Sequence, residues 1–319
     1  MASTFIDTTT ASAIIGTMFD NMTVRELRPN YVFDALSQEK IWNLSSPPKK
    51  GDTMSFPLLS SLTANTAALD ATNDAIGTGA ETLTYTRRNV SLALYGDHAV
   101  VDVLGLEPQA FADAVADTGW AIRDQGLKSI NKLSRNVMDL NKYSNEASGT
   151  ISSTYHSYGS SGTASSIGSL KSVDVRRVHS HLKSNNVSPW PDGYYRWIVD
   201  PKGATQLRAE TGNAAWRAFQ NASPNAEDGV TPGAVGYYEG FLFIVDNECL
   251  GAGTGTITSY AMGREAVGKA VGKDLSIVPN KNLRGVHENL LILRWEALIG
   301  YKVIRRVALH TVEHNNDSL

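Results

Sequence analysis

The chain has 319 residues, of which 42% are hydrophobic and 19% charged, and its formal net charge at pH 7 is −3. This length supports one large domain or two ordinary ones, and the slightly acidic balance excludes a protein that binds nucleic acid through overall basic charge. The single cysteine, Cys249, excludes an intrachain disulfide and is expected to be a small buried side chain. Its being the only one fits a reducing compartment or a fold that is stabilised without disulfides.

Residues 1–48 and 49–96 predict two extended segments. Short apolar pieces in 1–48 alternate with helix breakers up to Pro47 and Pro48, so we expect an N-terminal arm that lies across other parts of the assembly. In 49–96, two strand-forming stretches, GDTMSFPLLS and LTYTRRNVSLALY, flank the polar residues 61–82. A two-stranded ribbon is marginal alone in water, and long connections without structure are uncommon in compact domains. We therefore expect an extended β-finger loop that lies on another copy of the chain.

Residues 97–150 predict a strand followed by an unusually long helix. The stretch DHAVVDVL at 97–104 is typical of a strand, and a helical pattern runs from about residue 106 to about 143. Its apolar residues recur at steps of three and four or their sums; they are Phe111, Val115, Ile122, Ile130, Leu133, Val137 and Leu140. About 35 helical residues would extend roughly 50 Å, and Gly119 and Gly126 are candidate bending points.

Residues 151–283 predict a mixed α/β domain, whose first residues belong to a Ser- and Gly-rich surface loop at 144–169. The stretch VDVRRVHSHLKSNNV indicates an amphipathic helix, YYRWIVD a buried strand, Pro201 the start of a second helix, 214–222 a third helix, and FLFIV another strand. Residues 284–319 predict a closing β-ribbon with a break or bulge at Gly300. Its apolar residues alternate; they are Leu291, Leu293, Trp295, Ala297, Ile299, Tyr301 and Val303.

The residue types that carry chemistry do not form a catalytic set. His179 and His181 are two apart on a predicted helix, so they do not share a face as metal ligands would. Asp246 and Glu248 could form a carboxylate pair, but they follow a strand whose end polar residues commonly mark. The glycines of 251–255 predict a flexible hairpin, because the lysine of a phosphate-binding loop is missing. We expect no enzyme activity, no cofactor and no metal site.

Two pairs of adjacent arginines are candidate contacts. Arg87 and Arg88 lie on the return strand of the predicted finger, and Arg305 and Arg306 on the closing ribbon. Each pair could bind carboxylates of a neighbouring subunit or touch phosphates. We expect structural pairing.

The order of these parts resembles one known family. Arm, finger, long helix, mixed α/β domain and closing ribbon follow one another as in tailed-phage major capsid proteins of the Hong Kong 97 type, a fold shared with encapsulin shells. GDTMSFPLL and TYTRRNVSLALYGDHAVVD resemble the extended loop, and LEPQAFADAVADTGWAIRDQGLKSINKLSRNV resembles the spine helix. YRWIVDPKGATQLRAE, GVTPGAVGYYEGFLFIVDN and TSYAMGREAVGKAV resemble the axial domain, and LLILRWEALIGYKVIRRVALH the return through the peripheral domain.

The resemblance implies an α+β capsid fold with five parts: arm 1–48, extended loop 49–96, peripheral domain with spine helix 97–150, axial domain 151–283 and closing ribbon 284–319. It implies pentamers and hexamers in an icosahedral shell that encloses double-stranded DNA without sequence-specific binding. Scaffolding, portal and decoration proteins are the implied partners. Because the arm begins almost at once, we expect scaffolding to be a separate protein if one is used.

We expect subunit contacts from the arm, the finger tip and the arginine pairs. These residues are Phe5, Ile14, Ile15, Leu69, Asp70, Asn73, Asp74, Ile76, Arg87, Arg88, Arg305 and Arg306. The N-terminal residues lack the features of a signal peptide, and no stretch has the roughly 18 apolar residues of a membrane span. We therefore expect synthesis in the host cytoplasm, residence in the virion and no membrane partner.

Some family members link subunits covalently through a lysine on the extended loop. No lysine occurs between Lys50 and Lys128, so we expect no such crosslink here. Two alternatives stay open at this point. One is an encapsulin-like compartment, and the other is a glycan-binding virion or surface protein that stacks sugars on aromatic residues; these would be Trp190, Tyr194, Tyr195 and Trp197.

Overall fold

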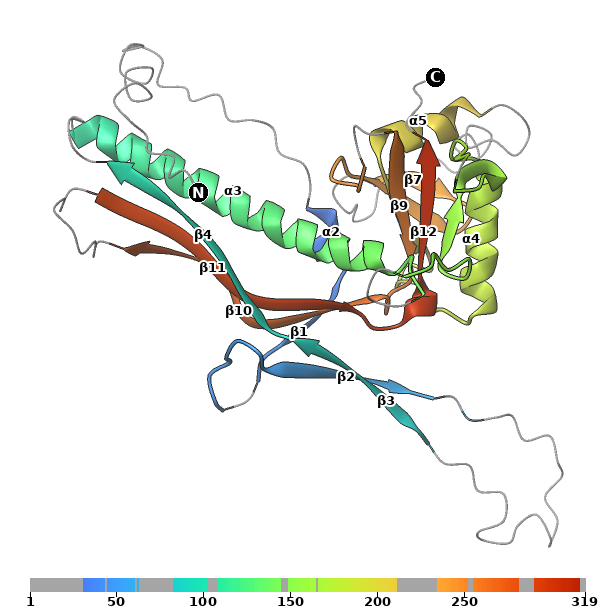
Figure 1. Cartoon of the computed structure of the whole chain (residues 1–319), viewed down its shortest axis with the longest axis horizontal. Coiled ribbons are helices and arrows are strands. Elements are labelled where there is room, and N and C mark those ends of the chain that lie inside the picture. Colours follow the sequence, from blue (N-terminus) through green and yellow to red (C-terminus); the bar gives the residue numbers. More distant parts are fainter. Residues whose placement is uncertain are drawn as a thin grey trace, which may run out of the picture.

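The computed structural model describes residues 31–43, 45–60, 62, 83–102, 108–144, 149–164, 166–210, 234–251, 255–280 and 290–315. Figure 1 shows two sheets, a long helix beside one of them, and a narrow ribbon that projects away from both. The four-stranded sheet has the order β1 (Gln38–Ile41), β10 (Val267–Asn280), β11 (Leu290–Val303) and β4 (Ala93–Asp102). The six-stranded sheet has the order β5 (His156–Tyr158), β12 (Leu309–Asn315), β9 (Thr256–Met262), β6 (Tyr195–Val199), β8 (Phe241–Val245) and β7 (Ala234–Tyr238).

The helix α3 (Pro108–Leu140) confirms the long helix predicted from residue spacing. It lies along the four-stranded sheet (Figure 1) and buries Ile122 and Ile130 in one cluster with Trp295 and Ile299 of β11. A Cβ atom on Gly126 would lie 2.7 Å from Leu275 and 3.2 Å from the Trp295 ring, so glycine lets the helix approach the sheet closely. The apolar alternation of β11 is therefore the face that packs on α3.

The six-stranded sheet carries the largest core. Trp197 of β6 stacks on Phe243 of β8 with ring centroids 5.4 Å apart, and both are fully buried. Helices α4 (Ser172–Ser184) and α5 (Pro201–Ala209) add Val178 and Leu207 to the same core. Helix α5 starts as predicted, with Pro201 in its first turn. Between these elements and the long helix, α2 (Val32–Ala35) inserts Phe33, whose ring meets Tyr260 edge-on at 5.4 Å.

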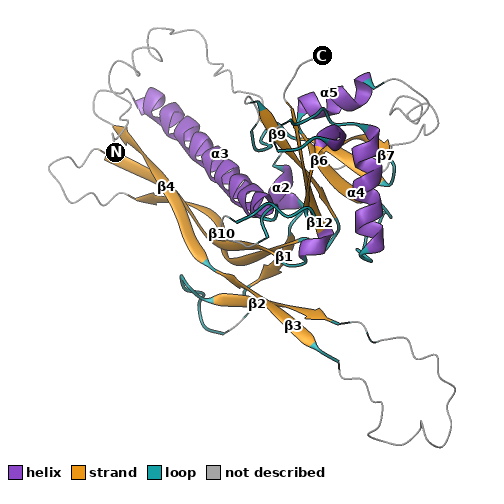
Figure 2. Ribbon diagram, turned by 45° about the vertical axis from the view of Figure 1, so that its right-hand side comes forward, coloured by secondary structure: helices purple, strands orange, loops and turns teal. Residues whose placement is uncertain are grey.

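The ribbon consists of β2 (Thr53–Leu59) and β3 (Tyr85–Ser91), which pair antiparallel and extend below the sheets (Figure 2). Its root is fixed by one face: Met54, Phe56 and Val90 form a cluster with Leu298 and Ile304. After Leu92 the chain continues straight into β4 of the four-stranded sheet. A single extended stretch thus passes from the ribbon into the sheet, across residue 96 where the finger was predicted to end.

Strand pairing differs from the predicted division in two places. Strand β10 was assigned to the axial domain, but it pairs with β11 in the four-stranded sheet. Strand β12 was assigned to the closing ribbon, but it pairs with β9 and β5 in the six-stranded sheet. The physical reason is that apolar alternation identifies a strand and its buried face, while its hydrogen-bonding partner depends on where the chain turns.

The predicted break at Gly300 is wrong. Gly300 stays in register opposite Ala270, and the register shifts of this strand pair fall between Val271 and Ser276 instead. A Cβ atom on Gly300 would collide with the backbone carbonyl oxygen of Ser91, where β3 crosses the sheet. The glycine therefore permits a close approach of two backbones.

Candidate subunit-contact site

Eight of the predicted contact residues lie outside the described part of the chain. They are Phe5, Ile14 and Ile15 of the arm, and Leu69, Asp70, Asn73, Asp74 and Ile76 of the finger tip. The described part holds the four arginines and the two segments from which the arm and the tip emanate. We call residues 31–41 the arm root.

The distal end of the β2–β3 ribbon exposes a group of apolar side chains. Leu59 and Tyr85 lie directly opposite each other and are 57% and 62% exposed. Leu62 and Leu83, just beyond the paired strands, are about as exposed. We call these four residues the ribbon patch. Apolar side chains gathered on a segment with no core of its own are typical of a surface that another molecule covers.

Arg87 and Arg88 lie on opposite faces of this ribbon, because neighbouring residues in a strand alternate. Arg87 is exposed and opposite Pro57, on the same face as Leu59 and Tyr85. Arg88 is half-buried opposite Phe56, on the face that packs against the sheet. Only Arg87 of the pair therefore belongs to the exposed surface of the ribbon.

Arg305 and Arg306 bind within their own chain. Arg305 donates hydrogen bonds to the carbonyl oxygens of Asn185 and Asn186, at 3.1 and 3.2 Å. Arg306 donates to the carbonyl oxygens of Tyr143 and Ser144, at 2.5 and 2.9 Å, and thereby fixes the segment after α3. Both lie within the predicted segment 284–319, but on the short connection between its two strands, β11 and β12.

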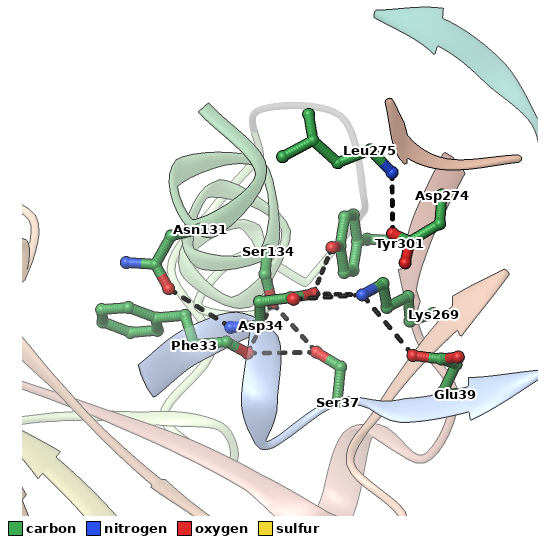
Figure 3. Close-up of polar contacts among 10 residues, drawn as sticks. All are labelled: Phe33, Asp34, Ser37, Glu39, Asn131, Ser134, Lys269, Asp274, Leu275 and Tyr301. Carbon is green, nitrogen blue, oxygen red and sulfur yellow. Dashed lines mark hydrogen bonds and ion pairs between the residues drawn. The ribbon is translucent and has the colours of Figure 1, made fainter. Parts of the chain in front are cut away.

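The arm root is held by a charged cluster centred on Asp34 (Figure 3). Lys269 of β10 places its Nζ 2.9 and 3.0 Å from the two Asp34 carboxylate oxygens, and 3.6 Å from Glu39. The Tyr301 hydroxyl donates to Asp34 Oδ1 at 2.5 Å. Burial, followed by the Asp34 charge, raises the pKa of Tyr301, so the hydroxyl stays a donor. The cluster ties α2 and β1 to two strands of the sheet.

Helix α3 binds the other side of the arm root. The Asp34 backbone N–H donates to Asn131 Oδ1 at 3.3 Å, and the Ser134 hydroxyl donates to the Phe33 carbonyl oxygen at 3.0 Å. Ser37 donates to the same carbonyl at 3.1 Å. Figure 3 shows these side chains converging from the helix, the sheet and α2. The arm root is therefore fixed by contacts with both the long helix and the four-stranded sheet.

The residues considered for metal or acid–base chemistry serve the fold. His179 meets the rings of Tyr195 and Phe241 edge-on, while His181 lies beside the His310 ring, 5.0 Å between centroids. Among the residues that the structure describes, no three His, Cys, Asp or Glu side chains gather as a metal site would require.

Asp246 and Glu248 do not act as a pair. Asp246 is buried, which raises its pKa, and its Oδ1 accepts from the backbone N–H of Glu248 at 2.8 Å. The Glu248 carboxylate instead lies 3.4 Å from Lys132 of α3. Cys249 is buried as predicted, and burial raises the pKa of its thiol well above the ordinary value.

The glycan-stacking alternative is wrong for two of its four residues. Tyr195 and Trp197 are 1% and 0% exposed because every residue of β6 is buried in the six-stranded sheet. Trp190 is covered by the Arg196 guanidinium at 5.3 Å, and Tyr194 packs on Tyr237 at 4.4 Å. An aromatic platform of these four residues therefore does not exist.

A cavity of about 330 Å³ lies where the ribbon root, the end of α3 and the end of β11 meet. We call it the junction cavity. Its lining residues are Asn89, Val90, Ser91, Val137, Leu140, Asn141, Tyr301, Lys302, Val303 and Arg306. Sequence analysis missed it because three stretches more than 40 residues apart in the chain create it, and none of them carries a motif. Within the described ranges, no helix is apolar over enough length to cross a bilayer.

Several solved structures have an architecture similar to that of this chain. The capsid of Ralstonia phage GP4 matches with a TM-score of 0.69 at 13% identity, over 94% of this chain and 95% of that chain. The head structure of Helicobacter pylori bacteriophage KHP40 matches at 0.67 and 10%, over 93% and 95%. The capsid of cyanophage Pam1 matches at 0.64 and 15%, over 94% and 96%. Neither a protein-family model nor a curated protein matches the sequence. The chain has the fold of tailed-phage major capsid proteins of the Hong Kong 97 type.

Proposed function

We propose that this protein is a major capsid protein, a non-enzymatic subunit that assembles into pentamers and hexamers of an icosahedral head shell around phage double-stranded DNA. The observation that carries the proposal is the ribbon patch. Leu59 and Tyr85 are more than half exposed at the distal end of a two-stranded ribbon, beyond its buried root. Such a ribbon gains stability when another molecule covers it. The likeness to solved phage capsids supports a second copy of the chain as that molecule.

The contacts required for a shell follow from head-to-tail geometry. A ribbon that lies on a different surface of the next subunit makes a heterologous contact, and such contacts close into rings when the rotation per subunit allows it. The finger tip, the arm and the exposed Arg87 supply further contacts in this proposal. Scaffolding, portal and decoration proteins are the partners of such a shell, and the virion is its location.

The assembly role of the finger is tested by removing residues 64–79. Sedimentation and electron microscopy of the purified full chain should give closed particles, or rings of five and six. The deletion should give soluble capsomers or monomers with an unchanged circular dichroism spectrum, since the residues removed lie beyond the paired strands of the ribbon. A control that replaces 64–79 with a Gly-Ser linker of equal length should fail in the same way. Normal shells from either variant would contradict the proposal.

Covalent linkage of subunits through the extended loop is not expected. The loop has no lysine between Lys50 and Lys128 to supply the amine. Mature particles boiled in denaturing detergent should therefore run as single chains on electrophoresis. Ladders of covalent multimers would show that another residue forms the bond.

A further inference from the structure

We propose that the exposed side of helices α4 and α5 binds the phosphate backbone of duplex DNA. The whole chain has a net charge of −3, but these two helices with their capping residues, 171–185 and 200–210, contain six Lys or Arg and three Asp or Glu. We call the exposed side of α4 and α5 the helix face. The inference rests on the proposed function, since the DNA inside the head is the polyanion that this face would meet.

The cations of the helix face are all exposed to solvent; they are Lys171, Arg176, Arg177, Lys183, Lys202 and Arg208. Arg176 and Lys183 are two helical turns apart, so they lie on one side of α4, roughly 10 Å from each other along its axis. The opposite side of α4 packs into the core through Val175, Val178 and Leu182. Figure 2 shows α4 and α5 next to each other beside the six-stranded sheet.

The carboxylates of the same two helices serve hydrogen bonds within the fold. Asp174 is 1% exposed; its Oδ2 accepts two backbone N–H groups at 2.8 and 3.0 Å, and its other oxygen lies 3.8 Å from Arg177. Asp200 is 5% exposed and caps α5 by accepting a backbone N–H at 2.9 Å. Glu210 accepts the backbone N–H and the hydroxyl of Ser172, at 2.8 and 2.9 Å, and so joins the end of α5 to the start of α4. Solvent therefore meets mainly the cations.

The two cations at the centre of α4 have contacts that a phosphate can join or replace. The Arg176 Nε lies 3.7 Å from the Glu239 carboxylate, which is longer than a hydrogen bond, and the Arg176 side chain is 46% exposed. Exposed ion pairs of this kind contribute little free energy. The Lys183 Nζ lies over the Tyr195 ring, 5.6 Å from its centroid, and this contact positions the ammonium without cancelling its charge.

The composition of the helix face favours a phosphate backbone over an acidic protein. Protein interfaces have an apolar centre, whereas the large hydrophobic side chain that this face exposes is Val173 alone. Arginine binds phosphate oxygens through two parallel N–H groups, and exposed hydroxyls such as that of Ser180 are common phosphate donors. Duplex DNA carries one negative charge per about 1.7 Å of its axis, so two turns of α4 span several phosphates.

Charge reversal tests the helix face. The full chain, at concentrations below those that form particles, is titrated into a fluorescently labelled DNA duplex of mixed sequence, and anisotropy is measured between about 50 and 200 mM salt. Arg176→Glu with Lys183→Glu should weaken binding at least tenfold at the lower salt and reduce the slope of log K against log salt by about 2. Arg176→Lys, which keeps the charge, should bind as the unmodified chain does.

The matched control is Lys49→Glu with Lys50→Glu, which changes the net charge equally at two exposed residues ahead of β2. It should weaken binding by no more than about twofold, because salt screens distant charges. Equal losses in the two double variants would show that overall charge attracts the DNA and would overturn the proposal. So would an unmodified chain that does not bind the duplex, or an acidic peptide of equal charge that displaces the DNA as well as unlabelled duplex does.

Assembly is measured separately from DNA binding. The helix-face variant should form the particles or rings expected of the unmodified chain, as judged by sedimentation and electron microscopy. Normal assembly together with unchanged DNA affinity would overturn the DNA contact and leave the proposed function intact. Failure of the unmodified chain to assemble would refute the proposed function, and the anisotropy of the unassembled chain decides the DNA contact in either case.

Discussion

Acidification should weaken the six-stranded sheet, because three histidines are buried in it. His310 and His314 of β12 are 4% and 0% exposed, and His156 of β5 is 3% exposed. Burial, and then the charge of His181, lowers the pKa of His310 to about 3. Burial lowers the pKa of His314 to about 4, and burial with the nearby Lys142 lowers that of His156 to about 4. All three are therefore neutral in the folded protein at pH 6.

The sign and size of the effect follow from proton linkage. The unfolded chain takes up these protons near the ordinary histidine pKa of about 6.5, while the folded chain takes them up only near pH 3 to 4. The stabilisation is complete above pH 6.5 and is lost as the pH falls toward 4. Each histidine changes the free energy of unfolding by about 1.4 kcal/mol per pH unit, so three give an upper limit of about 4 kcal/mol between pH 6 and pH 5.

Buried carboxyl groups act in the opposite direction at lower pH, because burial raises their pKa and the folded state then binds a proton more readily. These groups are Asp139, Asp174, Asp200 and Asp246. The histidine contribution is therefore measured as the difference between the unmodified chain and a single-histidine variant at each pH, because the carboxyl contribution is common to both.

The assay is urea unfolding of the full chain at pH 7, 6 and 5, followed by tryptophan fluorescence. His310→Gln should lower the slope of the unfolding free energy against pH by up to about 1.4 kcal/mol per unit. His98→Gln is the matched control, because the His98 side chain is 63% exposed on β4, and it should leave the slope unchanged. A stability that does not depend on pH in this range, or a wild-type slope in the His310 variant, would refute the reasoning.

Two further substitutions test the packing of the arm root and the ribbon root by urea unfolding. Asp34→Ala should cost about 2–3 kcal/mol, since it leaves the Lys269 ammonium nearly buried without its closest counter-charge. Adding Lys269→Met should recover part of that loss, and strictly additive losses would argue against the pair. Gly300→Ala should cost about 1–3 kcal/mol through its collision with the Ser91 carbonyl. Gly119→Ala, in a part of α3 where a Cβ meets nothing within 4 Å, should instead stabilise by up to about 1 kcal/mol. Equal effects of the two glycine substitutions would contradict the close approach at Gly300.

The elements that could be predicted from the sequence are those with a local periodic signal. Apolar residues at steps of three and four predicted the helix that spans 108–140, and alternation predicted the strand at 290–303 together with its buried face. The stretch YYRWIVD indicated a buried strand for a different reason, because its apolar residues form a short continuous run and the whole strand is buried. In all three cases the signal lies within a few neighbouring residues of one element.

The candidate site was predictable only in part. The exposed strand ends at Leu59 and Tyr85 fall within the segment expected to lie on a neighbour. Three of the four arginines predicted to contact another subunit lie elsewhere. Arg88 faces the sheet of its own chain, and Arg305 and Arg306 bind backbone carbonyl groups of their own chain. Arg87 alone of the four is exposed on the ribbon. Two adjacent arginines in a sequence show that positive charge is present. The direction of each side chain, and the carbonyl groups that it can reach, depend on the elements packed around it.

By itself the sequence determined the long helix, several of the strands and the order of the parts, because these depend on residues a few positions apart. Only the tertiary structure decided that β12 joins the six-stranded sheet, that Gly300 admits the Ser91 carbonyl, and that the arm root is clamped by Asp34. Asp34 contacts Asn131, which lies 97 residues later in the sequence, and Lys269, which lies 235 residues later. Contacts over such separations form when whole elements dock, and no periodicity within one element records which other element will meet it.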